Sequence, residues 1–171
     1  PLISCGECNY CKNGREHLCV KRIILGMNKP IERQGCFAEL VIAPDKNIYE
    51  LPSNLDIKQA PIAEPTAVAL HAVELGEEVL KKPIDQSRVL VIGGGAIGLL
   101  CALILEKYKK CKEIVLVDPN EKRLKVCGDH LNSETLKPDN ITIKDSSFDV
   151  VFDTVGLEIT RQNSIKFVNP G

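Results

Sequence analysis

The sequence predicts an α/β protein in which a doubly wound parallel sheet follows a smaller, mostly β part. Three observations support this prediction. An apolar run from Val89 to Ile92 leads into a glycine turn, a helical segment and a second apolar run. Four cysteines stand close together between residues 5 and 19. Between these two features, short strand-like patterns are bounded by prolines and glycines.

Composition excludes several classes of function. The 171 residues carry a formal net charge of -1, which gives no electrostatic argument for nucleic acid or an anionic membrane surface. The longest apolar run, near Leu99 to Leu105, is far shorter than the roughly 20 residues of a membrane-spanning helix. No signal peptide precedes the first cysteine. We expect a cytoplasmic protein, and the start at Pro1 and the end at Gly171 indicate a piece of a longer one.

The cysteine cluster has the spacing of a metal site. Cys5, Cys8 and Cys11 form two overlapping C-x-x-C hooks, and Cys19 follows after a gap of seven residues. Four thiolates complete a tetrahedral zinc shell and leave no open position for water or substrate. The cluster therefore predicts a structural Zn²⁺ site, and metal binding should supply on the order of 10 kcal/mol toward folding of this lobe.

Other interpretations of the cysteines stay open. An iron-sulfur cluster also uses C-x-x-C-x-x-C, but its usual fourth cysteine comes after three residues and precedes proline, whereas Cys19 precedes Val20. A disulfide framework needs an oxidising compartment, for which nothing in the sequence argues. His17 is close enough to replace a cysteine ligand.

The middle of the chain predicts a hairpin and then a helix. Residues 37–42 and 47–51 have strand composition around a Pro44-Asp45 turn. Pro65 suits the first helical position, so Glu64 is predicted as the N-cap and most simply acts as a capping acid. The predicted buried face of this helix consists of Val68, Ala72, Leu75 and Val79. The polar stretch 81–87 marks a boundary, giving domains 1–82 and 83–171.

The glycine turn carries the main functional signal. Gly93, Gly95 and Gly98 follow the G-x-G-x-x-G spacing, in which the first makes the tight turn and the second lets the backbone approach a pyrophosphate. The third allows helix and strand to pack closely. Ala96 and Ile97 then open a helix whose free N–H groups face the phosphates. A dinucleotide site is predicted, and the alternative is a glycine-rich turn without a ligand.

The strand ends beyond this turn supply further cofactor candidates. Asp118 ends the strand 114–117, twenty residues after Gly98, where an acid can bind the adenosine ribose. A carboxylate there favours NAD over NADP, although Arg123 could receive a 2'-phosphate or lie over the adenine. A further strand, 148–153, precedes a turn formed by Thr154, Val155 and Gly156, and these three residues are predicted to contact the cofactor. Loop structure alone would also explain that glycine.

Taken together, CGECNYCKNGREHLC, GCFAELVIAPD, AEPTAVALHA, VIGGGAIG and Asp118 resemble the zinc-containing medium-chain alcohol and polyol dehydrogenases. The Glu64-Pro65 pair is similar to the sorbitol, butanediol and idonate dehydrogenase branch. The resemblance implies part of a GroES-like domain with the structural zinc lobe and a Rossmann-type domain that binds NAD(P). It also implies that Glu64 sits at a catalytic zinc, as a ligand or bonded to its water.

The departures from the family pattern shape the functional expectation. The other catalytic ligands, a cysteine and a His-Glu pair, are absent, because no histidine here is followed by glutamate. We expect the parent protein, a homo-oligomer, to transfer hydride between a secondary alcohol of a polyol or similar molecule and NAD(H), while this chain alone is inactive. The alternative is a non-catalytic nucleotide-binding module with structural zinc. Residues 128–147 are shorter than the family norm, which leaves the third strand and helix in doubt.

Overall fold

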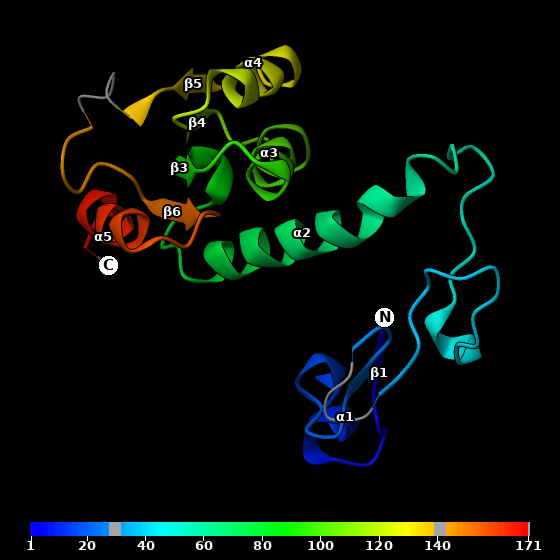
Figure 1. Cartoon of the computed structure of the whole chain (residues 1–171). Helices are drawn as coiled ribbons and strands as arrows, with labels where there is room; N and C mark the ends of the chain where they lie inside the picture. The colour runs from blue at the N-terminus through cyan, green and yellow to red at the C-terminus, as the bar shows by residue number, and fades with distance from the viewer. Residues whose placement is uncertain (28–31, 139–142, 171) are drawn as a thin grey trace. The chain divides into compact units, whose positions relative to one another are not determined.

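The computed structural model describes residues 1–27, 32–138 and 143–170. By their internal contacts, the residues fall into two compact units, Pro1–Leu55 and Asp56–Gly171 (Figure 1). The functional division into residues 1–82 and 83–171 stays a prediction. No helix in the described ranges is long and apolar enough to span a membrane.

The N-terminal unit has little regular structure. Its strands are β1 (Leu2–Ile3) and β2 (Ile23–Ile24), paired antiparallel, and its helical turns are α1 (Asn9–Lys12), η1 (Glu16–Leu18) and η2 (Asp45–Asn47). Among the described residues of this unit, Cys19 is the one that is fully buried. A unit without an apolar core needs another source of stability, and the cysteine cluster can supply it.

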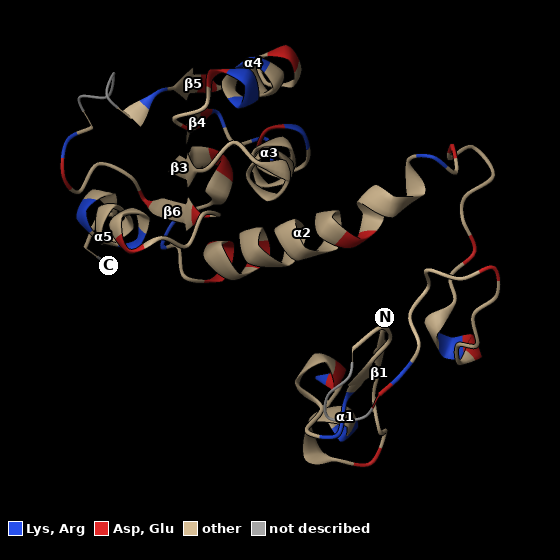
Figure 2. Cartoon of the chain, in the orientation of Figure 1, with Lys and Arg blue, Asp and Glu red and all other residues tan. Residues whose placement is uncertain are grey.

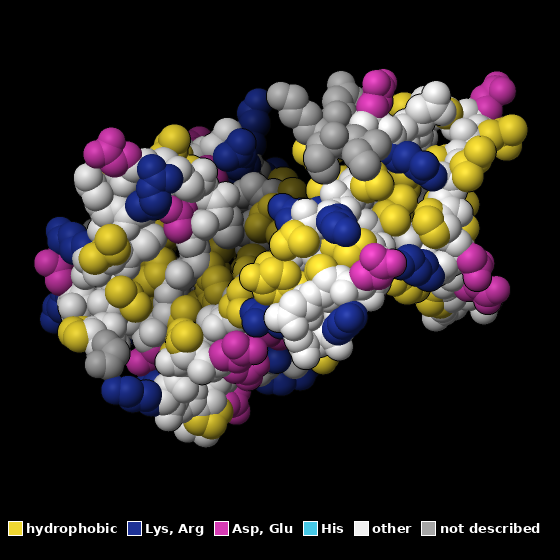
Figure 3. Space-filling model, turned by 90° about the horizontal axis from the view of Figure 1, so that it is seen from below, with side chains coloured by type: hydrophobic (Ala, Val, Ile, Leu, Met, Phe, Trp, Pro, Cys, Tyr) yellow, Lys and Arg dark blue, Asp and Glu magenta, His cyan; other side chains and the backbone are white. Residues whose placement is uncertain are grey.

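The predicted hairpin of residues 37–42 and 47–51 is wrong for this structure. Neither segment forms a strand, and η2 is the one regular element in the stretch. Phe37, Leu40 and Ile42 are exposed. A strand needs a neighbour to satisfy its backbone N–H and C=O groups, and the described residues provide none for either segment. Apolar side chains reach the surface on the face drawn in Figure 3.

The second unit begins with a long helix, α2 (Ala63–Glu78), which continues from the 3-10 turn η3 (Ala60–Ile62). The N-cap is Ile62, so the prediction that Glu64 caps this helix is wrong. Glu64 lies in the first turn, and Pro65 is the third helical residue. A proline is tolerated there because the first four N–H groups of a helix have no partner within it.

The buried face of α2 also differs from the prediction. Ala69 and Val73 are fully buried, whereas Val68, Leu75 and Val79 are about half exposed or more. Gly76 lies so close to β6 that a Cβ there would stand 2.7 Å from the Phe152 ring. The helix carries two apolar stripes, and the one with the smaller residues packs because it allows closer approach. Periodicity alone cannot distinguish the two stripes.

A four-stranded parallel sheet in the order β5-β4-β3-β6 forms the centre of this unit, which confirms the predicted α/β class. The strands are β3 (Arg88–Ile92), β4 (Glu113–Val117), β5 (Glu134–Leu136) and β6 (Val150–Asp153). The helices are α3 (Ala96–Leu103), which continues into the π-turn η5 (Ile104–Tyr108), α4 (Glu121–His130) and α5 (Glu158–Phe167); the 3-10 turn η4 (Ile84–Gln86) precedes β3.

Both faces of the sheet are covered, which is typical of parallel sheets. Val89 and Val91 pack with α2, α3 and α4, while Leu90 packs on the opposite face with Phe148 and Phe167. The second cluster is the smaller one. One reason is the connection between β5 and β6, because its described residues, 137–138 and 143–149, contribute no α-helix to this face. The third strand, which the short stretch 128–147 left in doubt, is present as β5. Acidic and basic residues are interspersed along the chain (Figure 2).

Candidate functional site

The four cysteines of the N-terminal unit converge on one point. All four Sγ atoms lie within 4.8 Å of one another, with Cys5 and Cys8 at 4.0 and 3.5 Å from Cys11. Zinc-sulfur bonds of about 2.3 Å in a tetrahedron place the sulfurs about 3.8 Å apart, so the four residues fit a Zn²⁺ ion. All eight cysteines are free thiols, and none forms a disulfide.

Backbone N–H groups and burial shift the pKa values of three of these cysteines in different directions. The N–H of Cys11 is the main cause that lowers the pKa of Cys8 to about 6, and the N–H of Glu7 lowers the pKa of Cys5. Burial raises the pKa of Cys11 to about 12, with a contribution from the Cys8 thiol. The backbone N–H of Cys5 also donates to Cys19 Sγ at 3.4 Å. Several donors therefore already face the sulfurs, as expected around thiolates that hold a metal.

The glycine turn after β3 is built as a close crossing of strand and helix. Gly93 has a φ of 105°, and its N–H donates to the carbonyl of Val117 at 2.7 Å. A Cβ on Gly98 would stand 1.8 Å from the Gly93 oxygen. Gly95 differs, because a Cβ there would meet no heavy atom within 4 Å. The third glycine is thus required by packing, and the second faces open space.

An open hollow lies beside this turn at the carboxyl edge of the sheet. α3 starts at Ala96 with Gly95 as a cap that offers no side chain, so no side chain occupies the N–H groups of the first turn. The hollow is lined by Gly94, Gly95, Ala96, Leu99, Asn120, Lys122, Arg123 and Val126. The positive end of the helix dipole and two basic side chains make it suitable for an anion.

Asp118 lies directly behind the glycine turn and is 1% exposed. Its carboxylate accepts the N–H of Gly94 at 2.8 Å and the N–H of Asn120 at 2.7 Å. The more exposed Arg123 approaches the same carboxylate at 3.4 Å. The sequence predicts Asp118 as a ribose ligand, and this internal role was not predicted. The parallel register, which pairs Ile92 with Val117, could have indicated it by setting Asp118 beside Gly93.

The loop after β6 also lies at the carboxyl edge of the sheet. Asp153 accepts the N–H groups of Val155 and Gly156, both at 3.0 Å, and the hydroxyl of Thr160 at 2.9 Å. Burial alone would raise the pKa of Asp153, but these donors outweigh it and hold the pKa below its usual value. Val155 and Gly156 are exposed, so the loop presents them to solvent at this edge.

This arrangement predicts an acid-sensitive loop. A depressed pKa contributes stability that is present above the unfolded value of about 3.9 and is lost as pH falls through the lower folded value. Asp153→Asn keeps an acceptor for the two N–H groups but removes the charge. We expect this substitution to lower the free energy of unfolding by about 1 kcal/mol at pH 7. In urea unfolding, that free energy should also depend less on pH in the acid range. The control is Asp129→Asn, which changes an exposed aspartate and should leave the pH dependence of the unfolding free energy as in the wild type. If both variants lose this pH dependence equally, Asp153 is not its source.

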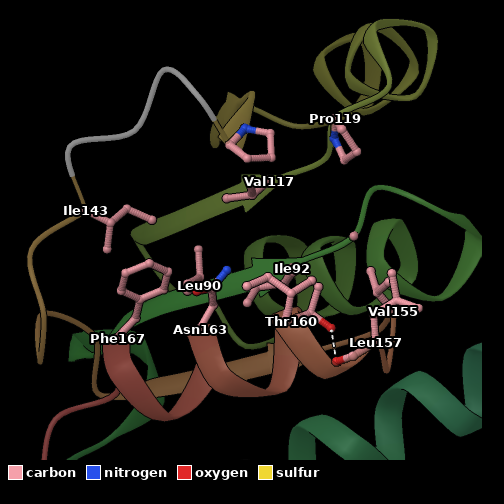
Figure 4. Close-up of a pocket in the computed structure, with 13 residues that line it drawn as sticks. Leu90, Ile92, Val117, Pro119, Ile143, Val155, Leu157, Thr160, Asn163 and Phe167 are labelled. Atoms are coloured by element: carbon pink, nitrogen blue, oxygen red, sulfur yellow. Dashed lines mark hydrogen bonds between the residues drawn. The ribbon is translucent and has the colours of Figure 1, made fainter.

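A cavity of about 300 Å³ opens between the sheet and α5, next to the glycine turn (Figure 4). Asn163 and Phe167 point from α5 toward Leu90 of β3, and Pro119 and Val155 flank the end near Gly93. The lining is mostly apolar and comprises Leu90, Ile92, Gly93, Val117, Pro119, Pro138, Ile143, Val155, Leu157, Ile159, Thr160, Asn163 and Phe167. The hollow and this cavity adjoin the same turn from its two sides.

The structure therefore brings together most of the cofactor residues predicted from sequence. Gly93, Gly95, Gly98, Asp118 and Val155 share one edge of the sheet. Glu64 does not lie at this edge. It is exposed near the N-terminus of α2, the helix that extends away from the sheet in Figure 1. Within the described ranges, the four cysteines are the one group of three or more side chains that could hold a metal.

Comparisons with known proteins agree with this arrangement. Residues 1–53 match the alcohol dehydrogenase GroES-like domain. The L-threonine 3-dehydrogenase of Proteus mirabilis (strain HI4320) is 37% identical over 122 residues, or 71% of this chain and 33% of that protein. The structure of L-idonate 5-dehydrogenase from Escherichia coli K-12 has a TM-score of 0.86 at 25% identity, covering 98% of this chain and 49% of that one.

A structure with a bound dinucleotide is also similar. The zinc-binding dehydrogenase from Sinorhizobium meliloti 1021 bound to NADP has a TM-score of 0.81 at 27% identity, covering 99% of this chain and 49% of that one. A Rossmann-type sheet joined in sequence to a four-cysteine lobe defines a class of zinc-associated dehydrogenases. The chain belongs to the zinc-containing medium-chain dehydrogenase family. It spans about one third of the curated relative and about half of the solved chains.

Proposed function

We propose that this chain is the zinc-lobe and dinucleotide-binding part of a dehydrogenase. The parent protein transfers hydride between a secondary alcohol of a polyol or similar small molecule and NAD(H). The observation that carries this proposal is the edge of the sheet where the glycine turn, the buried Asp118 and the loop at Val155 meet. The relatives named as threonine and idonate dehydrogenases support the reaction class.

The pyrophosphate is proposed to lie at the start of α3. Gly95 has no side chain to obstruct it, and the backbone N–H groups of Ala96, Ile97 and Gly98 belong to the helix's first turn. Such groups bind anions through hydrogen bonds and the helix dipole. Arg123 and Lys122 line the same hollow and add positive charge. The dinucleotide, when bound, supplies the hydride acceptor, and these residues fix its position.

NAD is proposed as the cofactor, with NADP as the second candidate. Asp118 is already bonded to two backbone N–H groups, yet a carboxylate has lone pairs for further donors such as ribose hydroxyls. A 2'-phosphate would be repelled by that carboxylate. Arg123 is the residue that favours NADP, since its exposed guanidinium could bind the phosphate. The apolar mouth between Pro119 and Val155 suits the flat adenine ring.

Zinc is proposed to serve two purposes in the parent protein. Cys5, Cys8, Cys11 and Cys19 would hold one ion with four thiolate ligands, which would leave no position for substrate and would stabilise the lobe. Glu64 is proposed to offer its carboxylate to a second, catalytic zinc, whose remaining ligands the described residues do not provide. That zinc, when bound, would polarise the alcohol oxygen.

The 171-residue chain alone is proposed to bind zinc and dinucleotide without turnover. The test measures NADH formation from NAD⁺ with L-threonine, L-idonate and sorbitol, using this chain and a longer protein that includes the coding sequence on both sides of it. We expect turnover by the longer protein only. Sustained turnover by the short chain would contradict the proposal. A longer protein that binds NADH but has no catalytic cysteine and no His-Glu pair would instead support the alternative, a non-catalytic nucleotide-binding module.

The role of Glu64 makes a separate prediction. In the longer protein, Glu64→Gln should lower kcat/KM by about 10- to 100-fold, as expected for a carboxylate at a catalytic metal. The control is Glu78→Gln, which changes an exposed glutamate at the other end of α2. Steady-state kinetics checks both variants. If the two variants have equal activity, Glu64 has no place at the reaction centre.

A further inference from the structure

Thr154, the residue after β6, is bonded to the glycine turn across the sheet. Its hydroxyl donates to the Ile92 carbonyl at 2.9 Å and lies 3.3 Å from the Gly93 carbonyl. Its backbone N–H donates to the same Ile92 oxygen at 3.0 Å. One residue therefore contacts both carbonyls by which β3 enters the turn.

The glycines of the turn leave the space that this hydroxyl fills. A Cβ on Gly93 would stand 2.6 Å from Thr154 Oγ1, and a Cβ on Gly98 would stand 2.9 Å from it. Side chains at either position would therefore displace the hydroxyl. On the opposite side, the Asp118 carboxylate accepts the N–H of Gly94 at 2.8 Å. Two side chains thus hold the turn from its two sides. The Thr154 hydroxyl, after β6, donates to it, and the Asp118 carboxylate, after β4, accepts from it.

We propose that Thr154 is a positioning residue for the dinucleotide. Its hydroxyl fixes the peptide planes at Ile92 and Gly93, and these planes set the direction of the N–H groups that follow at the start of α3. Pre-organised donors bind an anion without a further ordering cost. The inference rests on the proposed dinucleotide function and assigns Thr154 an effect that acts through the glycine turn.

The test compares three variants of the whole chain. Thr154→Val keeps the shape and removes the hydroxyl, Thr154→Ser keeps the hydroxyl, and Thr66→Val is the matched control. Thr66 also donates its hydroxyl to a backbone carbonyl, that of Ile62 at 2.7 Å, but does so in the first turn of α2. In NADH fluorescence titrations we expect Thr154→Val to weaken binding about five- to tenfold. Thr154→Ser and Thr66→Val should stay within about twofold of wild type.

A second ligand separates positioning from general damage. Adenosine lacks the pyrophosphate, so Thr154→Val should leave its affinity unchanged. Equal losses for NADH and adenosine would assign Thr154 a purely structural role and overturn the inference. If Thr154→Val does not fold, Thr154→Ala removes the same hydroxyl with a smaller side chain and gives the same comparison.

The outcomes also separate this inference from the proposed function. If the wild-type chain binds neither NADH nor adenosine, the dinucleotide function and the inference both fail. If the wild-type chain binds NADH and the variants without the hydroxyl bind it equally well, the inference alone is wrong.

Discussion

Gly98→Ala should abolish NADH binding and lower the free energy of unfolding of the second unit by more than about 3 kcal/mol. The added methyl would stand 1.8 Å from the Gly93 oxygen and 2.9 Å from the Gly93 carbonyl carbon. Both are backbone atoms of the residue directly after β3, which is held by its N–H bond to Val117 and by a strand paired on both sides. They cannot move aside without disturbing the end of β3. Urea unfolding and NADH titration measure the two effects.

Gly95→Ala is the matched control, because it adds the same methyl in the same turn. Its Cβ would meet no atom within 4 Å, and Gly95 has an ordinary φ of -75°. The variant should therefore be as stable as the wild type but bind NADH more weakly, since the methyl projects where the pyrophosphate is proposed to approach. Wild-type stability in Gly98→Ala would contradict the close crossing described above.

The second large effect is expected from the metal lobe. Cys8→Ser should remove the bound zinc and unfold residues 1–55, because this unit has no apolar core and the metal supplies on the order of 10 kcal/mol. Zinc content and limited proteolysis of the purified chain measure these losses. The second unit has its own core and should keep its NADH affinity.

Cys36→Ser provides the control for this experiment. Cys36 lies in the same unit but is exposed and stands outside the four-sulfur cluster. It should retain zinc and resist protease as the wild type does. A Cys8→Ser chain with full zinc content would show that the metal is held elsewhere and would remove the structural role of the cluster.

Local sequence was sufficient to predict the glycine turn and its flanking strands. Val89 to Ile92 reads as a buried strand because both faces of a parallel sheet are covered, and the structure has β3 there. The cysteine spacing likewise predicts a cluster whose sulfurs converge, because short hooks need no distant partner. These features depend on interactions within a few residues.

Features that depend on distant partners were not predictable in the same way. The strand composition of 37–42 is real, but a strand also needs a neighbour to pair with, and the described residues offer none. The choice of Ala69 and Val73 over Val68 and Leu75 on α2 depends on contacts with α3 and β6. The bond from Thr154 to Ile92 joins residues 62 positions apart, and no local motif indicates it.

The most direct test of the account is the metal content of the purified chain, determined by elemental analysis together with an NADH titration. We expect about one zinc per chain, because the four cysteines form a closed site and the described residues hold no second group of ligands. We also expect saturable NADH binding. Iron in place of zinc, or no metal and no NADH binding, would contradict both the structural zinc site and the dinucleotide function.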